Sequence, residues 1–185
     1  MKTQLPASVS RIVLVGFMGA GKSTIGALLA QQLQWNFLDA DQVLESRLQM
    51  TIAQIFDQRG EKEFRRLESL LIHELAAQDR LVLALGGGAM ETEATRELIL
   101  QSPDTCVIFL KAPLEVMIAR CEQQPGAAIR PVLNDRERLL QRFQSRLPHY
   151  ERAHLVIETA QLTIQETSHQ IVAALSASLK ENAPA

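Results

Sequence analysis

The sequence is short of cysteine and of aromatic residues. It has two cysteines, Cys106 and Cys121, which are too few for a disulfide framework. Cys106 lies in an apolar run typical of a buried strand, so we interpret both cysteines as free thiols of a reducing compartment. Aromatic residues make up 4% of the chain, which argues against a stacking surface for single-stranded nucleic acid.

The sequence also lacks a strong net charge and a long apolar run. Its formal net charge is −2, so no overall field draws the protein to nucleic acid or anionic lipid. No uninterrupted apolar run is as long as the stretch of about 20 residues that spans a bilayer. Met1–Ser10 has no apolar stretch typical of a signal peptide. We therefore expect a cytoplasmic protein that binds neither nucleic acid nor membranes.

Short apolar runs alternate with amphipathic segments along the chain. The apolar runs predict five strands, at residues 12–15, 36–38, 81–85, 106–110 and 155–157. Helical spacing predicts helices at residues 25–33, 42–77, 92–100, 113–120, 134–146 and 164–179, the second of them broken near Gly60. This alternation predicts an α/β fold of three layers, in which helices flank both faces of a five-stranded parallel sheet.

We expect a single domain over residues 1–185 with two insertions in its α/β core. The core covers about residues 11–39, 79–121 and 135–180. A helix-rich segment of about residues 40–78 is the first insertion. A polar segment of about residues 122–134, which contains Pro125-Gly126, is the second and is expected to be mobile. No long exposed apolar heptad suggests a coiled-coil dimer, so we expect a monomer.

One glycine-rich segment has the pattern of a phosphate-binding loop. Residues 16–23 read Gly-Phe-Met-Gly-Ala-Gly-Lys-Ser, which fits G-x-x-x-x-G-K-[ST] between a predicted strand and a predicted helix. Small residues let the backbone N–H groups point at phosphate oxygens, and the helix N-terminus adds positive charge. The Lys22 ammonium can reach the β- and γ-phosphates, and the Ser23 hydroxyl can bind Mg²⁺.

Two carboxylates, Asp39 and Asp41, follow the second predicted strand. Ligands of parallel sheets bind beyond the carboxyl ends of the strands, so these side chains are expected to face the γ-phosphate. One could hold Mg²⁺ through water, and the other could accept a proton from an attacking hydroxyl. The alternative is that Asp41 only caps the helix that follows.

Three arginines are candidates for binding anionic groups. Arg130 lies in the polar segment, from which a moving loop could bring positive charge to the transferred phosphate. Arg65 and Arg146 could hold an anionic acceptor in bidentate geometry, which lysine does not provide. Each arginine also has an explanation that involves no ligand. Arg65 could form an ion pair with Glu61, and Arg130 could be a solvated loop residue. Arg146 could lie at the end of a helix and interact with the helix dipole.

Three consecutive glycines, Gly86–Gly88, end the predicted strand at 81–85. A tight turn would explain them. The functional alternative is a bare backbone against which an acceptor molecule lies.

Taken jointly, these motifs resemble the shikimate kinases, small P-loop kinases built like nucleoside monophosphate kinases. The resemblance runs from about residue 12 to 179, and it rests on Gly-Phe-Met-Gly-Ala-Gly-Lys-Ser-Thr at 16–24, Asp-Ala-Asp at 39–41, Phe-Arg-Arg-Leu-Glu at 64–68, Gly-Gly-Gly at 86–88, Arg-Pro-Val-Leu at 130–133 and Arg-Leu-Pro-His-Tyr at 146–150. It implies a P-loop fold in which residues 40–78 bind the substrate and residues 122–134 form a lid. It also implies the transfer of the γ-phosphoryl group of ATP to the 3-hydroxyl of shikimate.

The resemblance also assigns roles to single residues. ATP would bind at Gly19, Ala20, Gly21, Lys22, Ser23, Thr24, Arg120 and Arg130. Shikimate would bind at Asp41, Arg65, Gly87 and Arg146. Lys22, Asp41 and Arg130 would take part in catalysis. Ser23 would bind Mg²⁺ directly, and Asp39 would bind it through water. The family places Arg120 and the loop at 158–162 near adenine.

Two other functions fit part of the pattern. One is a different small-metabolite P-loop kinase, such as a gluconate kinase, although paired acceptor arginines and Gly86–Gly88 favour a carboxylate-bearing acceptor. The other is a nucleotide-dependent switch without catalysis. The presence of both Asp41 and Arg130 argues against a switch, which needs neither an acceptor carboxylate nor a lid arginine.

Overall fold

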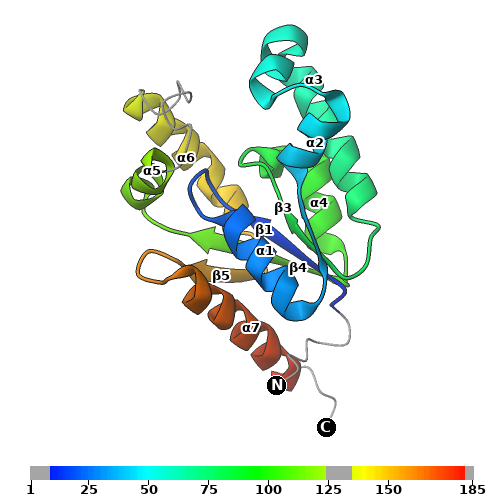
Figure 1. Cartoon of the computed structure of the whole chain (residues 1–185), viewed down its shortest axis with the longest axis vertical. Helices are drawn as coiled ribbons and strands as arrows, with labels where there is room; N and C mark the ends of the chain where they lie inside the picture. Colours follow the sequence, from blue (N-terminus) through cyan, green and yellow to red (C-terminus); the bar gives the residue numbers. More distant parts are fainter. Residues whose placement is uncertain (1–8, 124–134, 182–185) are drawn as a thin grey trace.

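The apolar runs form one parallel sheet in the computed structural model, which describes residues 9–123 and 135–181 (Figure 1). The strands are β1 (Arg11–Val15), β2 (Asn36–Asp39), β3 (Leu81–Ala84), β4 (Thr105–Lys111) and β5 (Leu155–Glu158). Their order is β2-β3-β1-β4-β5, and each neighbouring pair is parallel. All residues of β1 and β3 are buried, as continuous apolar strands covered on both faces should be.

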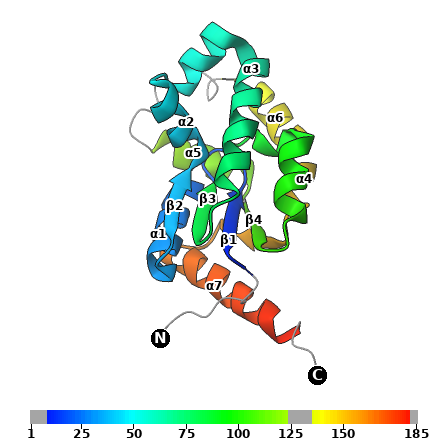
Figure 2. The same cartoon turned by 90° about the vertical axis from the view of Figure 1, so that its right-hand side faces the viewer.

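Helices cover both faces of this sheet. They are α1 (Lys22–Leu33), α2 (Ala40–Leu48), α3 (Ile52–Leu75), α4 (Glu93–Gln101), α5 (Leu114–Glu122), α6 (Arg136–Tyr150) and α7 (Ile164–Glu181), with a short 3₁₀ helix η1 (Ala89–Glu91). α1 packs against α7 on one face, and α3 packs against α4 on the other (Figure 2). This arrangement confirms the predicted three-layer α/β fold. Within the described residues, no helix is long and apolar enough to cross a membrane.

The register of the strands brings three loops together at the carboxyl ends of the strands. Leu14 of β1 pairs with Ala84 of β3, and Ala84 also pairs with Asp39 of β2. β1, β2 and β3 therefore end at the same level. The loop after β1, the Asp39–Asp41 corner and Gly86–Gly88 all follow these strand ends, where ligands of parallel sheets bind.

The segment predicted as one helix over residues 42–77 is divided into α2 and α3. Gln49 ends α2 in the left-handed conformation, with φ 52°. Thr51 then begins α3 with a capping box, in which its side chain accepts from the Gln54 N–H. The predicted break near Gly60 is confirmed, because Gly60 has φ 77° and ψ 165° inside α3. α2 and the N-terminal part of α3 project beyond the sheet (Figure 1).

Helix α6 is longer than the predicted helix at 134–146. It continues through Pro148 to Tyr150, so Arg146 precedes the last turn. The interpretation of Arg146 as a helix-end residue is therefore wrong. α5 reaches Glu122, the first residue of the predicted lid, and residues 124–134 lie outside the described part of the chain.

Both cysteines are buried free thiols, as predicted. Cys106 lies on β4, where burial raises the pKa of its thiol to about 11. Cys121 lies on α5 with its Sγ against the phosphate loop, 2.9 Å from where a Cβ on Gly19 would stand.

Candidate active site

The loop between β1 and α1 is shaped by glycines in conformations that other residues rarely adopt. Gly19 has φ 75°, and a Cβ placed on it would stand 2.2 Å from the carbonyl oxygen of Met117. The loop backbone therefore lies directly against α5, and only glycine fits there. Lys22 curls back over the loop, donating from Nζ to the carbonyl oxygens of Gly16 at 2.9 Å and Phe17 at 3.1 Å.

The Lys22 ammonium lies in a strongly desolvated position. Burial lowers its pKa, while the charges of Asp41 and Asp39 act in the opposite direction. A phosphate group in the loop would bring the negative charge that a buried ammonium needs. This arrangement suits Lys22 for holding an anionic ligand.

Ser23 and Asp39 are joined across the site. The Ser23 hydroxyl donates to Asp39 Oδ2 at 2.5 Å. The other carboxylate oxygen, Oδ1, accepts from the backbone N–H groups of Asp41 at 3.0 Å and Gln42 at 3.3 Å. Asp39 is thus the N-cap of α2, and the alternative that Asp41 caps this helix is wrong. The cap fixes the Asp39 carboxylate beside the loop.

Asp41 and a second carboxylate, Glu68, approach the same glycine. A Cβ on Gly86 would stand 2.7 Å from Asp41 Oδ1 and 2.6 Å from Glu68 Oε1. Burial raises the pKa of both carboxyl groups, and the charge of Asp39 raises that of Asp41 further. Two desolvated carboxylates therefore lie beside one stretch of bare backbone.

Sequence reasoning missed Glu68 as a functional residue. It is 2% exposed, and its Oε2 accepts from Arg65 Nη1 at 2.6 Å. Its Oε1 has no hydrogen-bond partner among the described residues. Its position three residues after Arg65 on one helix face was the available signal.

Arg65 of α3 and Arg146 of α6 converge at Gly86–Gly88. A Cβ on Gly88 would stand 2.2 Å from Arg65 Nη2, and one on Gly87 would stand 3.6 Å from Arg146 Nη1. Both guanidinium groups face the same oxygen, Glu91 Oε2, with Arg146 Nε at 2.9 Å and Arg65 Nη2 at 3.9 Å. The structure brings the two predicted acceptor arginines together.

Contacts with other side chains also hold each guanidinium group in position. The expected ion pair of Arg65 with Glu61 is present at 3.5 Å, but the contact with Glu68 is shorter. The Arg146 guanidinium lies 5.8 Å from the centre of the Phe17 ring. Tyr150, which sequence reasoning also missed, donates from its hydroxyl to the Gly87 carbonyl oxygen. Fixed guanidinium groups lose little conformational entropy when they bind an anion.

The remaining predicted residues lie in or near the glycine-rich loop, at the end predicted to bind the nucleotide, or outside the described part of the chain. Ala20 is buried within the loop, and Thr24 is exposed in the first turn of α1. Arg120 of α5 donates to Thr159, to its hydroxyl at 3.1 Å and to its carbonyl oxygen at 2.6 Å. It thus lies at the loop following β5. Arg130 is outside the described residues.

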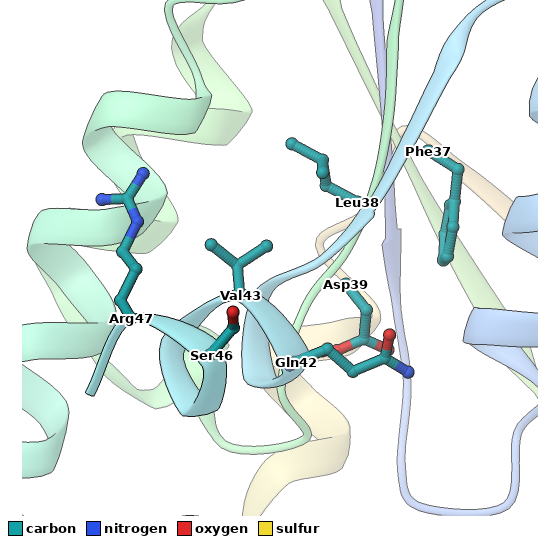
Figure 3. Close-up of a pocket in the computed structure, with 7 residues that line it drawn as sticks. All are labelled: Phe37, Leu38, Asp39, Gln42, Val43, Ser46 and Arg47. Atoms are coloured by element: carbon teal, nitrogen blue, oxygen red, sulfur yellow. The ribbon is translucent and has the colours of Figure 1, made fainter. Parts of the chain in front are cut away.

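A separate open groove of about 380 Å³ runs along the outer edge of β2 and α2 (Figure 3). Its lining residues are Phe37, Leu38, Asp39, Gln42, Val43, Ser46 and Arg47. Only Asp39 is shared with the predicted site. Arg47 is bound by Glu74 through two contacts of 2.6 Å, so the groove offers no unpaired cation for a phosphorylated ligand.

The described residues contain no group of three or more His, Cys, Asp or Glu side chains placed to hold a metal ion. A magnesium ion bound with a nucleotide does not need such a group, because phosphate oxygens and waters supply most of its ligands. The oxygens of Ser23 and Asp39 are of the kind that Mg²⁺ prefers.

Comparison with known proteins places this geometry in a family. The family model described as shikimate kinase matches residues 18–176. A shikimate kinase of Thermus thermophilus is 37% identical over 175 residues, which cover 92% of each chain. This chain belongs to the shikimate kinase family.

Solved structures agree with that assignment. A shikimate kinase from Acinetobacter baumannii in complex with shikimate superposes with a TM-score of 0.81 at 35% identity, covering 92% of this chain and 94% of that one. A gluconokinase from Sinorhizobium meliloti superposes with a TM-score of 0.55 at 15% identity, covering 93% and 94%. The second likeness shows the shared fold alone. The shikimate kinases are ATP-dependent kinases, so the chain is an enzyme of that class.

Proposed function

We propose that the protein transfers the γ-phosphoryl group of ATP to the 3-hydroxyl of shikimate, giving 3-phosphoshikimate and ADP. The observation that carries this proposal is the convergence of Arg65 and Arg146 beside Gly86–Gly88, on the side where Asp41 approaches. Shikimate has both groups that this site would recognise, a carboxylate and ring hydroxyls.

The nucleotide would bind at Gly19–Thr24, with its phosphates under the backbone N–H groups and Lys22 at the β- and γ-phosphates. Mg²⁺ would be held by Ser23 directly and by Asp39 through water, where it would neutralise charge on the phosphates. Arg120 would lie beside the adenine, because its partner Thr159 follows β5 at the nucleotide end. Arg130 would supply charge to the transferred phosphate.

The acceptor would lie between α3 and α6. Arg65 and Arg146 would bind its carboxylate, and the ring would rest on Gly87, where a Cβ would meet no atom closer than 3.6 Å. Asp41 would contact the ring hydroxyls. Because burial raises its pKa, Asp41 is a stronger proton acceptor than an exposed carboxylate.

The transfer would be an in-line displacement. The acceptor oxygen forms a bond to the γ-phosphorus while the bond to the β-bridging oxygen breaks, the hydroxyl proton passes to Asp41, and ADP leaves. Lys22, Arg130 and the backbone N–H groups of the loop stabilise the charge on the transferred group. Most of the acceleration comes from alignment and charge stabilisation.

The same proposal includes the organisation of the chain. One domain over residues 1–185 would combine the α/β core with a substrate-binding insertion at about residues 40–78 and a lid at about residues 122–134. The protein would act as a monomer in the cytoplasm. Sedimentation of the purified protein tests the monomer, and activity of a variant with residues 124–134 shortened tests the lid.

A coupled assay for ADP release tests the reaction, with shikimate, gluconate and nucleoside monophosphates as acceptors. We expect turnover with shikimate. Arg65→Ala should raise the KM for shikimate about tenfold or more, because its charge-assisted contact exists in ground and transition states alike. Arg65→Lys should also be poor, because a point charge replaces a planar fork.

Arg66→Ala is the matched control, because its side chain is 58% exposed and pairs with Glu63. It should leave the KM for shikimate unchanged. Turnover with gluconate but none with shikimate would contradict the proposed acceptor. Tight ATP binding without any phosphorylated product would favour a nucleotide-dependent switch.

A further inference from the structure

A carboxylate of the chain itself stands where the two acceptor arginines meet. Glu91 lies on η1, directly after Gly86–Gly88. Its Oε2 accepts from Arg146 Nε at 2.9 Å and lies 3.9 Å from Arg65 Nη2. One carboxylate oxygen is therefore shared by guanidinium groups that come from α6 and α3.

The hydrogen bond to Arg146 uses a nitrogen that a bound carboxylate would also need, and the same Glu91 oxygen lies within ion-pair distance of Arg65. The Nε–Nη edge of a guanidinium is one of the edges that grips a carboxylate in bidentate geometry. Glu91 occupies the Nε of Arg146, so this edge is not fully available to another anion. Any carboxylate that binds both arginines at this point must compete with Glu91 or suffer repulsion from it.

We propose that Glu91 is an internal competitor for the acceptor carboxylate. In the free enzyme it holds Arg65 and Arg146 together, and it is displaced when the acceptor binds. This inference rests on the proposed function, in which these two arginines bind the carboxylate of shikimate. Glu91 therefore sets the affinity for the acceptor without taking part in phosphoryl transfer.

The structure lets the Glu91 side chain leave while its backbone stays in place. Arg96, which is 9% exposed, donates from Nη1 to the carbonyl oxygens of Met90 at 2.7 Å and Glu91 at 3.2 Å. The Glu91 N–H also donates to the Gly88 carbonyl oxygen at 3.0 Å. The Glu91 side chain is 36% exposed, so a rotation about its own bonds is enough to move the carboxylate into water.

Arg65 and Arg146 differ in what they would lose when Glu91 leaves. Arg65 keeps its 2.6 Å contact with Glu68 and its 3.5 Å contact with Glu61. For Arg146, Glu91 is the one ion-pair partner among the described residues. Displacement of Glu91 therefore leaves the Arg146 charge to be compensated by the incoming carboxylate.

Glu91→Gln tests this proposal, because glutamine keeps the shape and the hydrogen-bond acceptor but removes the charge. The affinity for shikimate, measured by calorimetry without nucleotide, should rise about three- to tenfold, the range for loss of a partly exposed charge-assisted ion pair. The KM for shikimate should fall in parallel, while kcat and the KM for ATP stay unchanged. Glu91→Ala should act in the same direction.

Glu97→Gln is the matched control, because Glu97 is exposed on α4 and pairs with neither arginine within the described chain. It should leave both affinities unchanged. The methyl ester of shikimate serves as a second control, because it lacks the negative charge. Glu91→Gln should change its binding much less than that of shikimate.

If Glu91 only positions Arg146, both Glu91 variants will weaken shikimate binding, and that result overturns the proposal. An unchanged affinity overturns it as well. Failure of the proposed function would look different, since the wild-type protein and Glu97→Gln would then show no shikimate turnover. In that case the competitor role of Glu91 falls together with the assigned acceptor.

Discussion

The Ser23 hydroxyl donates to the Asp39 carboxylate over 2.5 Å, although Ser23 lies at the start of α1 and Asp39 at the end of β2. The contact exists because β1 and β2 end at the same level on either side of β3. It places two oxygen ligands suited to Mg²⁺ beside the phosphate loop.

Ser23→Ala should reduce kcat/KM for ATP about 10- to 100-fold and raise the Mg²⁺ concentration needed for half-maximal activity, because it removes the hydroxyl that is proposed to bind Mg²⁺. Ser23→Thr keeps the hydroxyl and should retain most of the activity. The measurement is steady-state kinetics over a series of Mg²⁺ concentrations at fixed ATP. An unchanged Mg²⁺ requirement in Ser23→Ala would show that Ser23 is not a ligand.

Asp41 should make the activity fall at acid pH. Burial and the nearby Asp39 raise its pKa above the usual range of aspartate, so its carboxylate is protonated at a higher pH than that of an exposed aspartate. The rate of transfer should decrease as pH falls through this raised pKa. Asp41→Asn should lower kcat about 10²-fold or more and remove this limb of the pH profile. A limb that persists in Asp41→Asn would assign it to another group.

The raised pKa of Asp41 should make the folded protein more stable at acid pH, although the activity is lower there. Because the folded protein binds this proton more tightly than the unfolded chain, the free energy of unfolding decreases as pH rises through the raised pKa of Asp41. Asp41→Asn should therefore raise Tm at pH 7 in thermal denaturation. Asp57→Asn, at an exposed position of α3, should leave Tm unchanged. A lower Tm for Asp41→Asn would contradict the argument.

Gly87→Ala should separate folding from acceptor binding. A Cβ there would stand 3.6 Å from Arg146 Nη1 and 3.8 Å from the Tyr150 hydroxyl, which are ordinary contacts. Tm should stay unchanged, while the KM for shikimate rises because the added methyl group occupies the surface on which the ring is proposed to lie. The KM for ATP is the internal reference. If the KM for shikimate does not change, the ring does not rest on Gly87.

His154 should contribute to stability and not to catalysis. Its Nδ1 accepts from the Val107 N–H at 3.0 Å, and its Nε2 lies 3.1 Å from the Leu100 carbonyl oxygen. It thereby ties β4 to the end of α4 just before β5 begins. His154→Ala should lower the free energy of unfolding in urea by about 0.5–1.5 kcal/mol, since the partly buried hydrogen bond from the Val107 N–H is lost. His73→Ala, at an exposed position, should have little effect. Equal stability of the two variants would refute this role.

The fold and the phosphate loop could be predicted from the sequence because their signals are local. A continuous apolar run marks a buried strand, and the loop motif lies within eight consecutive residues. The division between α2 and α3 was also marked locally, by Thr51 and Gln54 of the capping box. It was missed because the helical pattern continues on both sides.

The acceptor end depends on contacts between distant residues, which no local pattern reveals. The sequence around Arg65 looks the same whether this residue only pairs with Glu61 or also binds a ligand. In the structure it does pair with Glu61. Glu91 belongs to no motif. The extension of α6 through Pro148 was missed because proline usually ends a helix, whereas here the helix continues to the buried Tyr150.

α6 carries Arg146, packs against η1 and follows β4 in the chain. The parts of the proposed site are therefore synthesised in a fixed order. During synthesis, a chain that has emerged as far as β4 already contains the nucleotide loop together with both strands that flank β1. It does not yet contain Arg146, which is one of the two arginines proposed to bind the acceptor carboxylate. The proposed acceptor site is therefore complete only after α6 has been synthesised, whereas the residues of the glycine-rich loop are present from an early stage.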